Sequence, residues 1–540
     1  MHNIFILLII LSCHFKIFAQ EIFTKADSLR GNDGPLRTCY DIQYYHLDIK
    51  MDIKAKLISG SNLFRFMATK KFDRLQFDLF ENMSIDKVLY KGIEIPFKRQ
   101  YNAVFLQFPK KISKGSVQEF TVFYSGKPTI ASNAPWDGGF VFAQDQQQKP
   151  WAAVACQGLG ASSWWPNKDQ QVDEVDSMLI SVSVPNGLMN VSNGRLRSID
   201  IGKEYTKYDW FVSNPINNYD VTLNIGDFVN FSDTYNGQSG ELSLDYYVLK
   251  ENLQKAQNHF STNVKAMLKS FEYWFGPYPF YKDGYKLVDA PYLGMEHQSA
   301  IAYGNNYQNG YLGSDLSKTG LGLTWDYIII HESGHEWFGN NITSKDIADM
   351  WIHESFTMYA ESLFIESQQG KEAGIKYIDG LKLKIRNDKP IIGPYHVNKE
   401  GSSDMYFKGA NMLQTIRAVI NNDERWLKIL RGLTKQFGQK TITTEEIVSY
   451  INQTAGMKLT NVFNQYLRFK DIPILEFKKL ANGTINYRWK ADVVDFDMPI
   501  QAMDGDTILN LKPTTTWKEV PIKTNFRPDV TNYYINVIQQ

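Results

Sequence analysis

Residues 38 to 235 contain short runs in which polar and apolar side chains alternate. His46–Lys54 is one such run, and Leu179–Val184 is another that is rich in β-branched residues. Alternation of this kind places successive side chains on opposite faces of a strand. Turn sequences at Pro185–Gly187 and Ser192–Gly194 separate the runs at short intervals. The pattern predicts a large antiparallel β-sheet domain.

The spacing of apolar residues changes from alternating to helical after about residue 245. Apolar and aromatic residues recur at helical spacing over Glu251–Phe275, and Gly276 and Pro277 close this segment. Helical patterns then dominate as far as about residue 468. Thr443 and Glu446 have the spacing of a capping box and predict the start of one further helix.

Beyond Pro473 the pattern returns to strands, with hairpin turns predicted at Asn482-Gly483 and Asp504-Gly505. At 540 residues the chain is also too long for a single compact core. We therefore predict a multidomain α+β fold with an N-terminal antiparallel β-sheet domain, an α-rich region and a small C-terminal β-sandwich. The predicted ranges are 1–19 for a signal peptide, 20–237, 238–468 and 469–540.

The N-terminal segment has the features of an export signal. Ile4–Leu11 is wholly apolar, but it is too short to span a bilayer and has the length of a signal-peptide core. We expect cleavage near Ala19 and a periplasmic or secreted protein. The alternative is a lipoprotein processed at Leu11-Ser12-Cys13, which would leave the chain anchored through Cys13. No other stretch reaches membrane-spanning length, so we expect no transmembrane span.

Charge and cysteine content narrow the class of protein further. The 58 basic residues equal the 58 acidic residues, which removes the electrostatic case for nucleic acid or an anionic membrane as a partner. Cys39 and Cys156 remain if Cys13 leaves with the signal, and the sequence leaves open whether they pair. The sequence makes no prediction of oligomeric state.

A metal-binding pattern lies in the α-rich region. His331 and His335 are four residues apart, so on a helix both imidazoles project from one face and can reach one Zn²⁺ ion. Glu332 lies between them and is placed to act as general base toward a zinc-activated water. A five-residue match of this kind is weak alone, because two ordinary helical histidines satisfy it.

A catalytic zinc site needs a third protein ligand and an open fourth position. Glu354 follows His335 after eighteen intervening residues, in a segment that also has a helical pattern. We predict one zinc ion per chain held by His331, His335 and Glu354. Glu361, two helical turns further on, either orients a ligand histidine or is a surface glutamate.

With these motifs the chain resembles the aminopeptidase N family of zinc peptidases. The resemblance rests on ordered segments spread over residues 40–470: Cys156-Gln157, Trp164–Asp169, Phe275–Phe280, Tyr292–Glu296, the His331–His335 motif with Glu354, Trp337–Asn340 and Tyr406–Gly409. It implies a saddle-like N-terminal domain and a thermolysin-like catalytic domain. The function that it implies is zinc-dependent removal of single residues from peptides with a free N-terminus.

The resemblance also implies roles for individual residues. Glu296 would bind the α-ammonium group of the substrate, and Gln157 would help to hold the same amine from the other domain. Tyr406 would donate its hydroxyl to the oxyanion that forms during hydrolysis. Gly294, Met295 and Tyr292 would line the substrate site. Trp136 and Phe140 are the aromatic residues expected near the pocket for the first side chain.

The chain departs from the family pattern at positions next to these motifs. His297 and His353 replace asparagines, Ser355 replaces a glycine and Glu336 replaces a glutamine. The two histidines are either additional titrating groups or, in the interpretation we favour, structural residues. Only about 70 residues follow Pro473, where many relatives have a large helical domain, so we expect a more open cleft.

Three other functions are compatible with the same motifs. A thermolysin-like endopeptidase would use the same zinc site, but an amine anchor at Glu296 would obstruct longer chains. A catalytically inactive relative would act as a binding protein, although such relatives usually lose a ligand or the base. The third alternative is hydrolysis of a non-peptide substrate.

Overall fold

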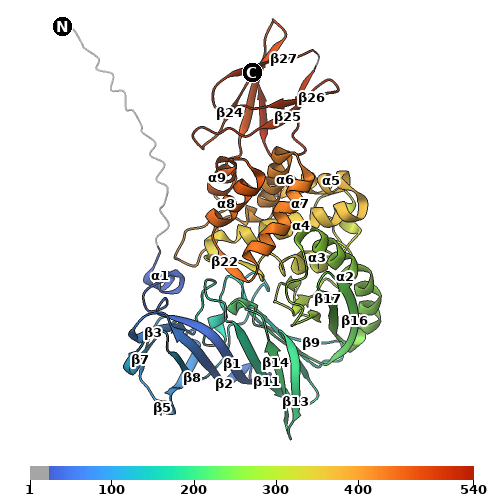
Figure 1. Cartoon of the computed structure of the whole chain (residues 1–540). Coiled ribbons are helices and arrows are strands. Elements are labelled where there is room, and N and C mark those ends of the chain that lie inside the picture. Colours follow the sequence, from blue (N-terminus) through green and yellow to red (C-terminus); the bar gives the residue numbers. More distant parts are fainter. Residues whose placement is uncertain (1–22, 524) are drawn as a thin grey trace, which may run out of the picture.

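The computed structural model describes residues 23–523 and 525–540. The chain forms an N-terminal β-sheet region, a helical catalytic region in the middle and small C-terminal sheets at the opposite end (Figure 1). The predicted signal peptide and Cys13 lie outside the described residues. Among the described residues, no helix has the length and apolar character that crossing a membrane requires.

The N-terminal region is built on an eight-stranded sheet. Its strands, in spatial order, are β13 (Arg195–Ile201), β14 (Tyr205–Val212), β11 (Ser177–Pro185), β1 (Tyr40–Asp52), β2 (Leu57–Ala68), β8 (Val117–Gly126), β4 (Met83–Tyr90) and β5 (Ile93–Glu94). The predicted alternation is present in β1, where Leu47, Ile49 and Met51 are fully buried and Lys50 is exposed. Neighbouring strands are antiparallel except β1 and β11, which run parallel, so the prediction of a purely antiparallel sheet was wrong at this pair. The segment between these two strands is long enough for such a crossover.

Two smaller sheets complete the N-terminal region. One has the order β3 (Phe72–Asp78), β7 (Ala103–Ile112) and β6 (Phe97–Gln100), and the other has the order β12 (Met189–Ser192), β15 (Leu223–Gly226), β10 (Pro150–Ala155) and β9 (Gly139–Gln144). The short helix α1 (Lys25–Gly31) precedes them. Cys39 and Cys156 are separate buried thiols, so the alternative of a disulfide between them is not realised.

The catalytic region opens with a five-stranded sheet of order β16 (Phe228–Gly237), β17 (Gly240–Leu249), β18 (Tyr285–Asp289), β20 (Ile301–Tyr303) and β19 (Gly294–Met295). The predicted boundary between residues 237 and 238 therefore falls in the turn of the β16–β17 hairpin, and the domain ranges stay a prediction. Helix α2 (Leu253–Phe275) confirms the helix expected from apolar spacing. It buries Phe260, Val264 and Phe271 on one face.

The helices that follow surround the site. They are α3 (Tyr327–Gly334), α4 (Trp351–Gln369), α5 (Lys371–Leu381), α6 (Phe407–Ile420), α7 (Asp423–Phe437), α8 (Thr444–Ala455) and α9 (Thr460–Arg468), with the short strands β21 (Ile342–Ser344) and β22 (Lys440–Ile442) between them. The predicted capping box is present at the start of α8, where Thr443 and Glu446 each bond the other's backbone. Helices α3 and α4 pack against each other, which brings the His331–His335 motif to Glu354.

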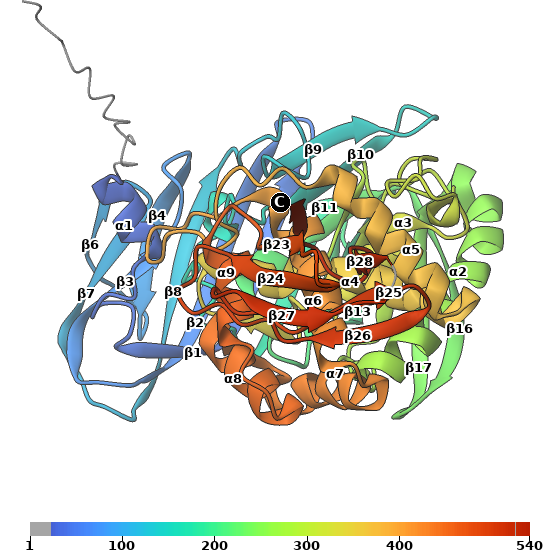
Figure 2. The same cartoon turned by 90° about the horizontal axis from the view of Figure 1, so that it is seen from above.

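The C-terminal region consists of two small sheets that lie over the helices (Figure 2). One has the order β27 (Lys518–Pro521), β24 (Thr484–Lys490), β23 (Ile474–Lys479) and β29 (Asn536–Gln539), and the other has the order β26 (Thr507–Leu511), β25 (Ile500–Asp504) and β28 (Phe526–Pro528). Both predicted hairpin turns are confirmed, because Asn482-Gly483 joins β23 to β24 and Gly505 joins β25 to β26.

Candidate active site

Helix α3 carries the first part of the site. Asp326 caps its N-terminus by accepting a hydrogen bond from the backbone N–H of Ile329. Ile328, Ile329 and Ile330 are buried, so the helix is packed both on the side that faces the cavity and on the opposite side. His331 and Glu332 lie in the last turn, and His335 is the residue that ends the helix. The predicted arrangement of the motif on one helix is thus present.

The side chains of His331, His335 and Glu354 converge on one point. Nε2 of His331 lies 3.7 Å from Oε2 of Glu354, and Nε2 of His335 lies 3.4 Å from the same oxygen. Three atoms placed tetrahedrally around a zinc ion at its usual bond lengths are about 3.4 Å apart. That Glu354 oxygen is buried without a hydrogen-bond partner. The three side chains therefore have the spacing and the unsatisfied donor atom that a zinc ion requires.

The outer nitrogens of both histidines are occupied by other acceptors. Nδ1 of His331 lies 2.7 Å from Oε1 of Glu361, and Nδ1 of His335 lies 3.1 Å from the carbonyl oxygen of Phe338. When Nδ1 donates a proton to these acceptors, Nε2 carries the lone pair that binds a metal. Glu361 is fully buried and also accepts a hydrogen bond of 2.6 Å from the hydroxyl of Tyr377. Glu361 was predicted to be either a surface glutamate or a residue that orients a ligand histidine. The structure supports the second interpretation.

The electrostatics of the cluster favour a positive charge. Burial opposes protonation of His335, but the nearby carboxylates of Glu354 and Glu296 outweigh this effect and raise its pKa to about 9. Burial also raises the pKa of Glu332, to about 7. Several buried carboxylates thus surround a point at which residues 23–523 and 525–540 place no lysine or arginine, and a divalent metal ion would neutralise them.

We expect Glu361→Gln to lower zinc affinity by about 10- to 100-fold, because the amide orients His331 less firmly and makes its imidazole a weaker ligand. Competition with a chelator of known affinity measures this loss without any activity assay. Glu372→Gln on the neighbouring helix α5 is the control, because Glu372 is exposed and far from the histidines. Unchanged zinc affinity in Glu361→Gln would contradict the orienting role.

Glu296 lies beside the metal cluster at the end of β19. One carboxylate oxygen of Glu296, one of Glu332 and a ring nitrogen of His335 all lie within 4.8 Å of one another. Glu296 is 3% exposed, and burial raises its pKa. Gln157, from the N-terminal region, donates a hydrogen bond of 2.5 Å to Oε1 of Glu296. The structure thus brings together the two residues predicted to bind an amine. Both lie beside the cluster of metal-ligand side chains.

Gly294 and Asn340 set the position of the Glu296 strand. A Cβ atom at Gly294 would lie 3.0 Å from Oε1 of Glu332, so a glycine lets the strand approach the catalytic helix closely. Asn340, from the Trp337–Asn340 motif, donates a hydrogen bond of 2.7 Å to the backbone carbonyl of Glu296. The role of Asn340 was not predicted, although its motif was recognised.

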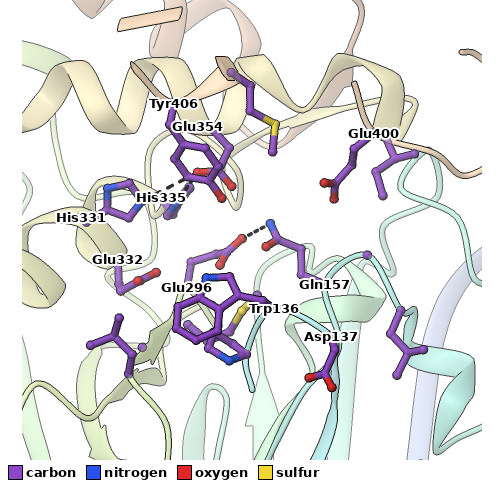
Figure 3. A pocket seen from close by; sticks show the side chains of 18 of the residues that line it. Trp136, Asp137, Gln157, Glu296, His331, Glu332, His335, Glu354, Glu400 and Tyr406 are labelled. Carbon is purple, nitrogen blue, oxygen red and sulfur yellow. Dashed lines mark hydrogen bonds and ion pairs between the residues drawn. The ribbon is translucent and has the colours of Figure 1, made fainter. Parts of the chain in front are cut away.

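Tyr406 faces the cluster from the opposite wall. It precedes α6, and its ring lies 6.1 Å from the ring of His331. In Figure 3 its hydroxyl end lies beside Glu354, across the cavity from Glu296. Gly409 permits this placement, because a Cβ atom there would lie 1.8 Å from the hydroxyl oxygen of Ser355. That hydroxyl donates 2.7 Å to the carbonyl of Met405, so Ser355 holds the residue before Tyr406.

Of the remaining residues predicted for the substrate site, some line the cavity and others do not. Met295 lines the cavity, and so does Trp136, whose side chain is 63% exposed. Phe140 was wrongly expected at the pocket, because it is fully buried and stacks on Phe142 in the core of the N-terminal region. Tyr292 is directed to strand β10 and donates 3.0 Å to the carbonyl of Val154. It holds the two regions together and does not line the cavity.

The two unusual histidines are buried and neutral. Burial lowers the pKa of His297 and of His353 to about 3 in each case. Nε2 of His353 accepts a hydrogen bond from the backbone N–H of Ser344. Glu336 is also directed away from the cavity and accepts 2.8 Å from the N–H of Ser299. His353 and Glu336 therefore support the backbone around the site, whereas neither ring nitrogen of His297 has a hydrogen-bond partner within the described residues.

The metal cluster, Glu332, Glu296, Gln157 and Tyr406 face one cavity of about 660 Å³ between the N-terminal and catalytic regions (Figure 3). His331, His335, Glu354 and Tyr406 occupy one end, Glu296 and Gln157 lie in the centre, and Glu400 lies beyond Gln157. The cavity can hold a metal ion at the first end and a cationic group between Glu296 and Gln157. Glu400 and Arg30, which also line it, were not predicted.

The donor set is the one that zinc metallopeptidases with a His-Glu-x-x-His motif and a glutamate as third ligand use. Residues 259–466 match the peptidase family M1 domain. The chain is thus similar to peptidase family M1 over this stretch, which contains the three converging ligands, Glu332 and Tyr406.

The relatives and solved structures agree with this family. The chain is 23% identical over 426 residues to "Probable aminopeptidase 1" of Sulfurisphaera tokodaii, covering 75% of this chain and 49% of the relative. It is 24% identical over 303 residues to aminopeptidase B of Rattus norvegicus, covering 51% and 41%. It thus spans about half or less of these relatives. A mutant M1 zinc metallopeptidase from Deinococcus radiodurans, solved with a Tyr-Ser-Ala substrate, has the same fold, with a TM-score of 0.64, 18% identity and coverage of 81% and 95%.

Proposed function

We propose that the chain is a zinc aminopeptidase that removes the first residue from oligopeptides with a free N-terminus. The observation that carries this proposal is the position of the Glu296 carboxylate, within 4.8 Å of a carboxylate oxygen of Glu332 and a ring nitrogen of His335. A buried carboxylate at this place needs a cation, and a terminal ammonium group supplies it. A peptide bond one residue from that ammonium then reaches the base and the metal ligands.

His331, His335 and Glu354 would hold the zinc ion. When bound, zinc supplies Lewis acidity, which makes a water more acidic and polarises the scissile carbonyl. Glu332 takes the proton from the attacking water and passes it to the nitrogen of the leaving peptide. Tyr406 donates its hydroxyl to the carbonyl oxygen, on which negative charge develops.

Glu296 and Gln157 fix the register of cleavage. Glu296 binds the α-ammonium, and the side-chain amide of Gln157 keeps the carboxylate in place through its 2.5 Å hydrogen bond. Because a chain extended beyond the first residue would meet this pair, endopeptidase activity is not expected. Holding the terminus in this way also aligns the carbonyl with the base, which contributes to the rate.

We further propose the finer architecture that the resemblance implies: a saddle-like N-terminal domain at 20–237, a thermolysin-like catalytic domain at 238–468 and a C-terminal β-sandwich at 469–540. Export, with cleavage of 1–19 near Ala19, is also proposed, with anchoring through Cys13 as the alternative. Mass determination of the mature N-terminus separates the two, because lipidation adds the mass of acyl chains to Cys13.

Mass spectrometry of peptide digests tests the proposed function. The full chain, loaded with zinc, is incubated with an unblocked peptide of five residues that contains no proline. We expect successive loss of single residues from the N-terminus and no internal fragments. Internal cleavage would identify an endopeptidase, and an intact peptide with zinc bound would indicate a binding protein or a non-peptide substrate.

A further inference from the structure

The cavity continues past the amine-binding pair to a second carboxylate, Glu400. This residue lies in the segment before α6, on the far side of Gln157 from the histidines (Figure 3). Its Oε1 lies 3.5 Å from the position that a Cβ atom on Gly158 would take. Gly158 directly follows Gln157 and has a φ of 72°, a value that favours glycine. The Glu400 carboxylate therefore lies next to the bare backbone of the residue that follows Gln157.

The carboxylate of Glu400 has no fixed partner. Within residues 23–523 and 525–540, no hydrogen bond or ion pair joins this carboxylate to another side chain. Burial, together with the negative charges of Glu354 and Glu296, raises the pKa of Glu400 to about 7 against the opposing charge of Lys389. A half-buried carboxylate in this position is stabilised when a cation binds beside it.

Three cations, Arg30, Lys389 and Lys399, also line the cavity, and Arg30 is used for other contacts. Arg30, from α1, donates to the backbone carbonyls of Gly158, at 3.1 Å, and of Leu159. Its guanidinium group also lies 5.5 Å from the ring centre of Phe80. The amide of Asn398 donates to the same Gly158 carbonyl at 3.4 Å. Asn398 thus joins the Gln157 loop to the Glu400 segment, and Arg30 joins the same loop to α1.

The position of the ammonium group decides what reaches Glu400. With the scissile carbonyl at the metal ligands and the amine between Glu296 and Gln157, the rest of the peptide leaves on the side away from the amine. No substrate residue precedes the one that carries the free ammonium group. The space beyond Gln157 therefore receives the side chain of the first residue, whose stem passes the bare backbone of Gly158.

We propose that Glu400 selects peptides whose first residue is lysine or arginine, an inference that rests on the proposed aminopeptidase function. Both side chains have an aliphatic stem of three or four carbons and a charged end. The stem suits the path beside Gly158 and Leu159, and the charged end reaches the carboxylate. A neutral side chain of the same length leaves Glu400 without a partner.

Pairs of substrates that differ only in charge test this inference. We expect the zinc-loaded full chain to hydrolyse arginyl amides with a kcat/KM about 10- to 100-fold above citrullyl amides, and lysyl above norleucyl amides by a similar factor. In Glu400→Gln the preference should fall to about threefold or less, while kcat/KM for the neutral substrates stays within about threefold. Glu400→Asp should retain part of the preference because the charge remains.

Glu241→Gln, which changes an exposed glutamate on β17, is the control and should keep the preference. Equal rates for charged and neutral substrates in the natural protein would overturn the inference and leave the aminopeptidase function intact. So would an equal loss for all four substrates in Glu400→Gln, because that pattern belongs to a residue that binds the amine. If zinc is bound and none of the four is cleaved, the proposed function fails and the inference fails with it.

Discussion

Glu332→Gln is expected to lower kcat by about 10²- to 10⁴-fold, the range that general acid–base catalysis contributes. The amide cannot take a proton from the attacking water, but it keeps the size of the glutamate in a buried position beside Gly294. Because Glu332 is not one of the three converging ligands, its replacement should leave zinc content at one ion per chain. Steady-state kinetics with an aminoacyl arylamide and metal analysis of the same sample measure both effects.

Glu354→Gln is the matched comparison for this prediction. It removes the negative charge of the carboxylate that both histidines face and leaves a weaker amide ligand, so both zinc and activity should be lost. If Glu332→Gln instead loses zinc, or keeps turnover within a few-fold of the natural protein, Glu332 is not the general base.

Glu296→Ala is expected to lower kcat/KM for unblocked substrates by about 10²- to 10³-fold. Removing one partner of a buried charge pair costs about 2–5 kcal/mol, because the other charge remains buried without a partner. Here that charge is the α-ammonium group of the substrate. Glu296→Gln should lose a similar factor, which separates the loss of charge from the loss of side-chain volume.

Glu296→Gln should also lose discrimination between free and N-acetylated substrates, because no carboxylate remains to require an ammonium group. Rates for both substrate forms, measured in the natural protein and in Glu296→Gln, test this expectation. If the variant keeps its full preference for the free amine, another group binds the N-terminus.

The motif spacing in the sequence predicted the centre of the site correctly. Two histidines four residues apart and a glutamate after eighteen more converge on one point, because α3 and α4 pack with these residues between them. Alternation also identified strand β1, and helical spacing identified α2 to within two residues at its start. These features depend on short-range patterns, which a single sequence displays directly.

The remainder of the site depends on contacts between distant segments. Arg30 and Gly158 are 128 positions apart, and Asn398 and Gly158 are 240 apart. No local period marks such residues, so Arg30 and Glu400 could not be found from the sequence. The error at Phe140 has a related cause: its buried ring packs against Phe142 and Trp164, and the contact with Trp164 is not visible in the local pattern.

The parallel pairing of β1 with β11 was missed for the same reason. The two strands are separated by more than 120 residues, and alternation predicts a strand without indicating its direction or its neighbour. Tyr292 shows the corresponding limit within a recognised motif. Its place two residues before Gly294 in the sequence suggested the pocket, but its side chain extends to the carbonyl of Val154.

The most direct test of the central claim compares two peptides that differ only at the N-terminus. The zinc-loaded full chain is incubated with one peptide carrying a free amine and with the same peptide after N-acetylation, with and without a chelator. We expect release of single residues from the free peptide, none from the acetylated peptide, and loss of activity in the chelator that returns on addition of zinc. Cleavage of the acetylated peptide at a comparable rate would contradict the amine anchor at Glu296 and with it the proposed aminopeptidase function.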